Sequence, residues 1–512
     1  MRLPPIVACA AASALIVAAP LAAATAAALD YDDARHLLDR TGFGATNVEI
    51  ERLVGISREQ AAKIVLAGAR SSALTPPPPW TAAPGPLRYP RAGASDADRK
   101  TFRREQVREG LELRGWWIGE MLATPSQLTE RMTLFWHNHF VSSQQKVRLA
   151  ELMYRQNVTL RANALGNFGT MLHAIARDPA MIVYLDSARN RSGAPNENFA
   201  RELMELFTLG EGHYGESDVK EAARAFTGWS LDRDSGEFRF RPLLHDYGSK
   251  TVLGKTGRFD GDDVVDILLA RPETAEFVVR KLWREFVSPD PDPAEVSRIA
   301  ARFRDSKYDI RTALYALLTS DAFYAPERRG ALIKSPVDLV VGTLHQFDLR
   351  PGNTIPFAVA VAGMGQNLFS PPNVKGWPGQ EAWINASTLL ARKQFLDKLF
   401  RADGTVIAAP QTAQDDSMMV AAAATDGAAG GNGGKDPDQA RAARFLRAVD
   451  RGVRSVQFDS AAWFAQWKAR DDRQRAAAAA SLLAVAPQSP LKAREPLALV
   501  RELTQDAAYE LK

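Results

Sequence analysis

Two glutamates and a histidine lie close together in the segment 196–229, where their side chains could do acid–base chemistry or bind a metal. Glu202 follows Asn198 by four residues and Glu205 follows Glu202 by three, so all three share one stripe of a helix. His213 follows in a glycine-rich corner. Carboxylates and imidazoles serve as general acids, general bases and metal ligands. The alternative is that these groups form ordinary ion pairs on solvated helix faces.

The spacing of apolar residues predicts that this segment is two helices joined by the corner. Asn196 is suited to cap the first helix, and Gly210 to end it. Ser217 is suited to cap the second helix, which we expect to run to Gly228. The buried face of the first helix is predicted to contain Phe199, Leu203, Leu206 and Phe207.

Three further histidines complete the candidate chemistry. His137 and His139 fall in a helical pattern, where their rings diverge by about 200° and cannot both bind one metal unless the helix ends there. One of them is expected in the core and the other towards the site. His245 precedes Asp246 in a loop, where the carboxylate could orient the imidazole. The catalytic candidates are therefore Glu202, Glu205, His245 and Asp246, and the candidate ligands of a divalent metal are His137, His139 and His213.

A second distinctive stretch, residues 365–392, contains an irregular loop rich in proline, glycine and tryptophan. Tryptophan faces with amides nearby could stack on sugar rings, or both tryptophans could anchor the loop to the core. Five residues of this loop are candidates for binding a substrate or partner: Asn373, Lys375, Trp377, Trp383 and Asn385. Asn196 and Asn198 from the first segment are further candidates.

The N-terminus predicts export. Residues 1–28 have one early arginine, a long apolar stretch and small residues suited to cleavage, which is typical of a signal peptide. The single cysteine, Cys9, lies within it, so a cleaved chain would contain no disulfide and no thiolate. No later stretch is long and apolar enough to span a membrane. The sequence therefore predicts a periplasmic or secreted protein.

Composition and periodicity predict a mainly α fold, an irregular multi-helix globular domain with a small β-hairpin insertion and long Pro/Gly-rich loops. The net charge of +4 gives no argument for nucleic-acid binding. We expect a helical core over 29–404, with a proline-rich surface or substrate-side loop at 75–94 and a small hairpin region at 229–256. An Ala/Gly-rich linker is predicted at 405–436, and C-terminal helices packed on the core at 437–512.

Several long motifs resemble one bacterial family, the "domain of unknown function 1800" family. They are HLLDRTGFGAT, ERMTLFWHNHFVSS, NENFARELMELFTLGEGHY, VKEAARAFTGW, HDYGSKTVLG and FSPPNVKGWPG with WIN after it. The resemblance implies a mostly helical, exported protein, often encoded beside an exported partner of the "domain of unknown function 1501" family, which resembles sulfatases and alkaline phosphatases. It carries no settled activity. Many members have histidine where this chain has Phe207, which argues against a ligand role for that position.

Two hypotheses follow. The first is a hydrolase, with or without a divalent metal, that acts on an envelope or extracellular polymer, glycans included. The second is a non-enzymatic binding or maturation partner of a co-exported sulfatase- or phosphatase-like protein, with the tryptophan–proline loop as its contact surface.

Overall fold

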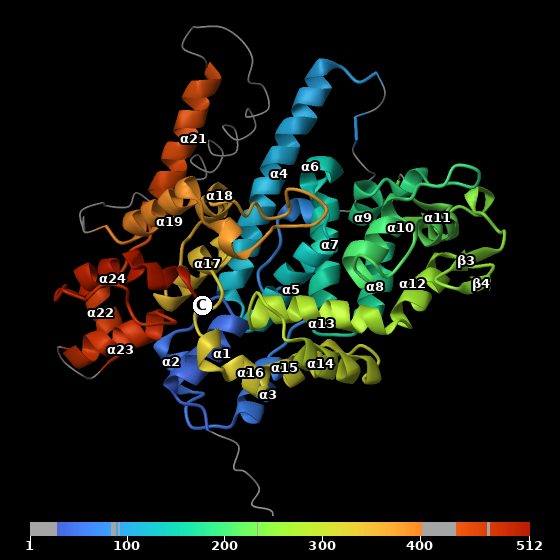
Figure 1. The fold of residues 1–512 in the computed structure, drawn as a ribbon. Helices are drawn as coiled ribbons and strands as arrows, with labels where there is room; N and C mark the ends of the chain where they lie inside the picture. The colour runs from blue at the N-terminus through green and yellow to red at the C-terminus, as the bar shows by residue number, and fades with distance from the viewer. Residues whose placement is uncertain (1–27, 83–88, 91–92, 233, 402–436, 468–471) are drawn as a thin grey trace, which may run out of the picture.

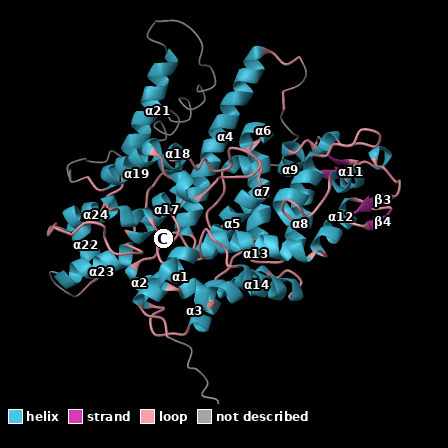
Figure 2. Cartoon of the chain, viewed as in Figure 1, coloured by secondary structure: helices cyan, strands magenta, loops and turns pink. Residues whose placement is uncertain are grey.

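The computed structural model describes residues 28–82, 89–90, 93–232, 234–401, 437–467 and 472–512. The described chain is mainly α, which confirms the predicted fold class (Figure 1). Strands are confined to two small sheets at one end of the molecule (Figure 2). The predicted signal peptide, apart from Ala28, and the predicted linker 405–436 lie outside the described residues.

The first part of the chain is helical and contains the long helix α4. Its elements are α1 (Tyr31–Thr41), α2 (Asn47–Glu51), α3 (Arg58–Ala67), η1 (Pro79–Thr81), α4 (Asp96–Ala123), α5 (Gln127–His139), α6 (Gln144–Val147), α7 (Ala150–Asn163), α8 (Phe168–Ala176), α9 (Pro179–Tyr184) and η2 (Ser187–Arg189).

The middle part contains the candidate site, both sheets and a further helical layer. Its elements are α10 (Asn198–Glu202), η3 (Leu203–Thr208), α11 (Glu216–Ala225), β1 (Trp229–Leu231), β2 (Phe238–Phe240), η4 (Pro242–Leu244), β3 (Lys250–Val252), β4 (Lys255–Gly257), α12 (Gly261–Leu269), α13 (Pro272–Phe286), α14 (Pro293–Asp305), α15 (Ile310–Leu318), α16 (Asp321–Tyr324) and η5 (Pro326–Arg328).

The last part begins beside the N-terminal helices and ends at the chain terminus. Its elements are α17 (Pro336–Gln346), α18 (Ile355–Gly363), η6 (Gln380–Trp383), α19 (Ala386–Leu399), α21 (Pro437–Arg454), α22 (Ser460–Ala465), α23 (Asp472–Leu482), α24 (Pro496–Gln505) and η7 (Ala507–Glu510). No helix in the ranges given above is long and apolar enough to cross a membrane.

Side-chain caps explain where many helices begin. Ser95 and Asp98 form a reciprocal capping box at the start of α4, and Ser335 and Asp338 do the same for α17. Each box satisfies two backbone N–H groups that the first turn leaves without partners.

The predicted hairpin is present, and β1 pairs antiparallel with β2 through Trp229–Phe240 and Leu231–Phe238. Asp232 closes the turn by accepting the N–H groups of Asp234 (2.9 Å) and Ser235 (3.1 Å). These contacts are those of an ordinary turn. A second small sheet pairs β3 with β4.

The helices enclose two hydrophobic clusters, and α5 contributes to both. Phe135 and Trp136 belong to the cluster around α8, α13 and α15. Leu134 belongs to the cluster of α4, α17, α18 and α19. Side chains on opposite faces of α5 therefore tie the two halves of the molecule together.

The C-terminal residues lie against the second cluster. The backbone of Lys512 exchanges two hydrogen bonds with Leu332, and its ammonium lies 2.9 Å from Asp338. Asp338 also contacts Arg131 of α5. Tyr509 lies 2.9 Å from Thr343 of α17 through the two hydroxyl oxygens. The end of the described chain thus contacts α17 directly and is linked to α5 through Asp338.

Candidate functional site

The helix that carries both candidate glutamates changes its winding between them. Asn196 precedes α10 and accepts the N–H of Asn198 (3.0 Å), so the helix begins two residues later than predicted. From Leu203 the backbone is a π-helix, in which the N–H of Leu209 donates to Met204 five residues before it (2.8 Å). Such π turns are rare and occur frequently at functional sites.

Two side chains from other helices satisfy carbonyl groups at the end of the π turn. The ammonium of Lys281 on α13 donates to the Leu206 carbonyl oxygen (3.1 Å). The Nε2 of His139, at the end of α5, donates to the Phe207 carbonyl oxygen (3.1 Å). These bonds fix the position of η3 and therefore of Glu205, which lies within it.

The same contacts define the state of His139. Its Nε2 donates to a carbonyl oxygen, so Nδ1 must be the acceptor that lies 3.1 Å from the Lys281 ammonium. Burial and the nearby Lys281 hold the pKa of His139 well below its ordinary value. Burial lowers the pKa of Lys281 to about 8. Both ring nitrogens of His139 are occupied, so this residue is a positioning group and is not placed to bind a metal.

Glu202 and Glu205 lie in different surroundings although they are three residues apart. Glu205 accepts the hydroxyl of Tyr214 (3.0 Å) and lies 3.9 Å from the ammonium of Lys375. Glu202 is half-buried and has no hydrogen bond with the residues that the structure describes. Burial and the charge of Glu205 raise the pKa of Glu202 above the ordinary value for a glutamate. These surroundings favour the protonated form of Glu202 relative to an exposed glutamate.

The tyrosines beside the pair respond to the same charges. Burial and the hydrogen bond to Glu205 raise the pKa of Tyr214 to about 12. Burial and the charge of Glu202 raise the pKa of Tyr184. Both side chains are therefore neutral near pH 7 and surround the carboxylates with hydroxyl groups.

The tryptophan–proline loop supplies Lys375 because it docks on the end of α5. The N–H of Trp377 donates to Asn138 Oδ1 (2.7 Å). Gly376 has φ +85°, and a Cβ there would overlap both the side chain and the carbonyl oxygen of Asn138. Only glycine allows this approach without strain. Two motifs far apart in the sequence thus meet beside Glu205.

The structure gives most predicted binding residues local structural contacts. Trp377 and Trp383 are both buried in the second hydrophobic cluster, which agrees with their interpretation as anchors of the loop. Asn373 accepts the N–H of Lys375 within the loop (2.9 Å). Asn385 caps α19 by accepting the N–H of Thr388 (3.0 Å).

His137 is the histidine that packs in the core. It lies between the rings of Trp117, Phe369 and Trp377, with centroids 5.5, 5.4 and 5.7 Å away. Neither ring nitrogen has a hydrogen-bond partner among the described residues. Burial lowers its pKa to about 3, so the ring is neutral near pH 7.

The expected pairing of His245 with Asp246 is not formed. His245 Nδ1 donates to the Thr227 carbonyl oxygen (2.8 Å), and the ring packs between Phe240 and Tyr247. Asp246 instead accepts two bonds from Arg224 (2.8 and 3.2 Å), which lower its pKa. The guanidinium offers a charged fork, which a carboxylate prefers to a neutral imidazole.

The three histidines predicted as metal ligands have separate surroundings. His213 is exposed in the corner after η3, whereas His137 and His139 are buried in different contacts. Within the described ranges no group of three or more His, Cys, Asp or Glu side chains is placed to hold a metal ion.

Sequence reasoning missed Lys281 and Tyr214. Lys281 lies three residues after the buried Val278, and residues at this spacing share a face of a helix. A lysine on the buried face of α13 was therefore the signal that could have identified it. Tyr214 had no such signal, because its contact with Glu205 depends on how the corner folds back.

The second helix of the pair begins at Glu216, one residue before the predicted cap, because Asp218 accepts the N–H of Gly215 (2.9 Å).

The comparisons with known proteins agree with the motifs. No curated protein and no solved structure matches the chain. One family model matches residues 36–507, which is nearly the whole chain. The chain therefore belongs to the family described as "Protein of unknown function (DUF1800)".

Proposed function

We propose that the protein is an exported hydrolase that cleaves glycosidic bonds in an envelope or extracellular polymer. The observation that supports this proposal is the contrast between the two carboxyl groups. Glu202 has a raised pKa and no hydrogen bond with described residues, whereas Glu205 is held by Tyr214 and faces Lys375. Titratable pairs whose surroundings separate their pKa values are the usual signature of an acid and a base.

In this proposal Glu202 is the general acid and Glu205 the general base. Glu202 gives its proton to the oxygen of the leaving sugar as the glycosidic C–O bond breaks. Glu205 takes a proton from the water that attacks the anomeric carbon. Two carboxyl groups in these roles are sufficient for glycoside hydrolysis.

Two neighbours have supporting roles. The Tyr214 hydroxyl donates to Glu205 (3.0 Å) and holds its carboxylate in position. The Lys375 side chain is 66% exposed and lies close to both Glu205 and Glu211, so its ammonium is accessible to the hydroxyl groups of a polymer. The docked tryptophan–proline loop would position that ammonium.

The proposal is tested by measuring the release of reducing ends from a panel of bacterial polysaccharides. We expect activity from the wild-type chain, and a loss of about 100-fold to 10,000-fold in Glu202→Gln or Glu205→Gln, the usual contribution of general acid–base catalysis. The matched control is Glu216→Gln, because this exposed carboxylate lies nearby but is paired with Arg201. Equal activity in all variants on a cleaved substrate would exclude the carboxylate pair.

A second candidate function, binding a co-exported protein, is favoured by an exposed apolar surface. Leu243 is 98% exposed and Tyr247 is 61% exposed, and Phe240 and Leu244 are also partly uncovered. Groups of exposed large apolar side chains often mark protein interfaces. The surface lies beside the β1–β2 hairpin rather than on the tryptophan–proline loop, whose tryptophans are buried.

The partner expected from the family resemblance is an exported protein of the "domain of unknown function 1501" family. We expect it to bind the wild-type chain in a pull-down of two purified proteins, and to bind a Leu243→Ser/Tyr247→Ser variant at least tenfold more weakly, since buried aromatic and aliphatic anchors contribute most of the binding energy. Leu390→Ser on α19 is the control, because Leu390 is also exposed. Equal binding by all three chains would exclude this surface.

A further inference from the structure

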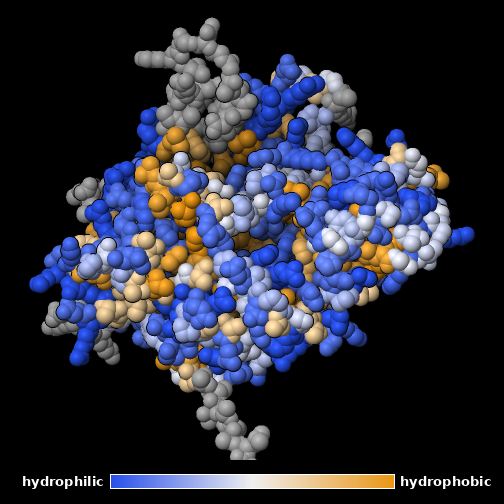
Figure 3. Space-filling model, in the orientation of Figure 1, coloured by the Kyte–Doolittle hydropathy of each residue, from blue (hydrophilic) through white to orange (hydrophobic). Residues whose placement is uncertain are grey.

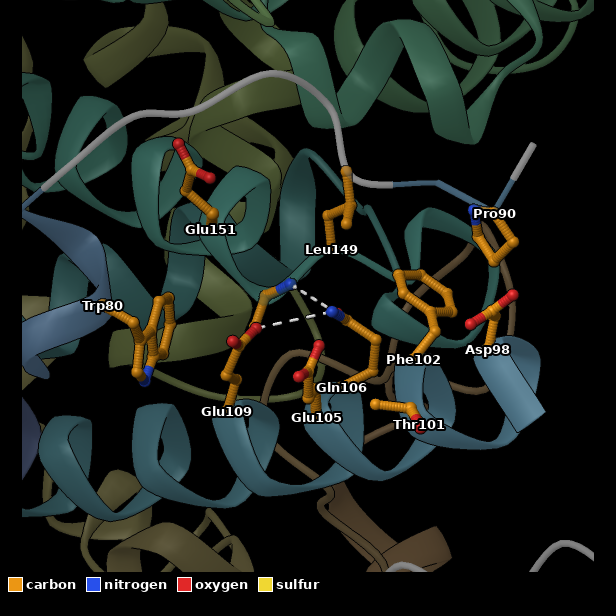
Figure 4. A pocket seen from close by; sticks show the side chains of 11 residues that line it. Trp80, Pro90, Asp98, Thr101, Phe102, Glu105, Gln106, Glu109, Leu149 and Glu151 are labelled. Atoms are coloured by element: carbon orange, nitrogen blue, oxygen red, sulfur yellow. Dashed lines mark hydrogen bonds between the residues drawn. The ribbon is translucent and has the colours of Figure 1, made fainter. Parts of the chain in front are cut away.

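A cavity lies between the N-terminal half of α4, the start of α7 and the segment around η1 (Figure 4). Its volume is about 280 Å³, close to the lower end of the range typical of small-molecule sites. It is separate from Glu202 and Glu205, which do not line it. Glu105 and Glu109 point into it from α4 in Figure 4. The cavity is therefore a second candidate site, independent of the proposed hydrolase chemistry.

Two aromatic side chains form opposite walls of the cavity, and both are fixed in position. The Trp80 indole N–H donates to Glu112 on α4 (2.7 Å). The Phe102 ring packs against Tyr89, with centroids 6.4 Å apart. The Tyr89 hydroxyl in turn donates to the Val147 carbonyl oxygen (2.7 Å). The walls thus form a rigid aromatic surface without the need for a ligand.

A further part of the lining is acidic. Four carboxyl groups line the cavity, those of Asp98, Glu105, Glu109 and Glu151. No lysine or arginine among the described residues lines it. Glu151 is paired with Arg155 (2.5 Å) and Asp98 caps α4. Glu105, by contrast, has neither a hydrogen bond nor an ion pair with any residue in the described ranges, so its carboxylate can accept a ligand.

An amide closes the floor of the cavity. Gln106 accepts the N–H of Ala150 (3.2 Å) and donates to Glu109 (3.4 Å). The first bond joins α4 to the start of α7, and the second, within α4, holds the Glu109 carboxylate towards the cavity, as Figure 4 shows. The carboxylates are therefore held on two helices that cannot move apart freely.

We propose that this cavity binds a small organic cation through its ammonium group. Aromatic faces attract ammonium groups through their quadrupoles, and several carboxylates around one space attract a cation more strongly than any one of them alone. A neutral or anionic ligand would have to desolvate these carboxylates without replacing the lost interactions. The aliphatic part of the cation would lie against Trp80, Phe102 and Leu149.

Calorimetric titration of the full chain with spermidine tests the proposal. We expect saturable binding at low salt that weakens as salt screens the charges, and none with triacetylspermidine, which has the same backbone but no ammonium group. Glu105→Gln should weaken spermidine binding about threefold to fivefold, the factor for losing one partly exposed ion pair. Trp80→Leu should weaken it by a similar factor through the lost cation–π contact.

Glu327→Gln is the matched control, because it removes the same charge from an exposed position on η5. It should bind spermidine as the wild-type chain does. If it weakens binding as much as Glu105→Gln, the cation binds the surface non-specifically and the proposal is wrong. Equal binding of triacetylspermidine would also overturn it. Circular dichroism of each variant, unchanged from the wild type, confirms that the comparison concerns folded protein.

Discussion

The Nε2 of His139 donates to the carbonyl oxygen of Phe207, 3.1 Å away, and this bond joins the end of α5 to the π turn that carries Glu205. His139 is therefore used to position the candidate base rather than to bind a metal. The Phe207 carbonyl is available for this bond because it lies in the last turn of the helix, where backbone carbonyls have no partner within the helix.

The contact between Lys281 and the π turn predicts a loss of stability when the ammonium is removed. Lys281→Met would leave His139 Nδ1 and the Leu206 carbonyl oxygen without their donor. We expect the free energy of unfolding to fall by ~1–3 kcal/mol, the cost of unsatisfied buried acceptors. Urea denaturation measures this change. The control is Lys63→Met, because Lys63 is an exposed residue of α3. Equal stability of both variants would show that the π turn holds its position without Lys281.

The close approach of Gly376 to Asn138 predicts a specific sensitivity in the tryptophan–proline loop. Gly376→Ala places a methyl group against Asn138 at φ +85°. We expect destabilisation of ~2–4 kcal/mol from overlap and backbone strain. Gly55→Ala is the matched control, because its φ is also +85° and nothing lies within 4 Å of its Cβ position; it should cost only the backbone strain, ~1–2 kcal/mol. Equal losses in thermal unfolding would show that the approach to Asn138 is unimportant.

A buried aspartate predicts how stability depends on pH. Asp178 caps α9 by accepting the N–H of Met181 (3.0 Å) and also accepts the Gln156 amide (2.9 Å). Burial raises its pKa from 3.8 to about 7. The folded state therefore retains a proton that the unfolded state has lost between about pH 4 and pH 7, so this group makes the protein less stable as pH rises through that range.

Asp178→Asn isolates this effect, because the amide oxygen can still cap α9 and carries no charge. We expect the variant to lack the part of the decline that Asp178 causes, and to be more stable than the wild type at about pH 8 by a few kcal/mol. Urea denaturation at several pH values measures the difference. The same pH dependence in both chains would mean that Asp178 is ionised in the folded protein well below pH 7.

The fold class was predictable because helical periodicity, N-caps and glycine stops occur along most of the chain. The hairpin was predictable from alternation in residues 237–241 and the Asp232 turn. The π turn was not, since the sequence of η3 has the same apolar spacing as an α-helix. Lys281 and His139, which contact its carbonyl groups, come from other helices.

The candidate site was predictable in part. Glu202 and Glu205 were identified because they share a helix stripe, and the structure brings Lys375 from the tryptophan–proline loop to Glu205. The pairing of His245 with Asp246 was wrong because neighbours in sequence need not share a hydrogen bond. Thr227 and Arg224 provide the stronger partners, and both depend on tertiary contacts. The cavity beside Trp80 had no signal in the sequence beyond the prediction that Trp80 and Pro90 lie in a surface or substrate-side loop.

The central claim is that the surroundings of Glu202 raise its pKa, which suits this residue to act as a general acid. The most direct test is an NMR titration of the full chain labelled with ¹³C at the glutamate side chains, with Glu202→Gln used to assign the signal. We expect Glu202 to titrate above the ordinary value for glutamate, and its pKa to fall in Glu205→Gln, where the neighbouring charge is removed. An ordinary pKa for Glu202 in both chains would contradict the account.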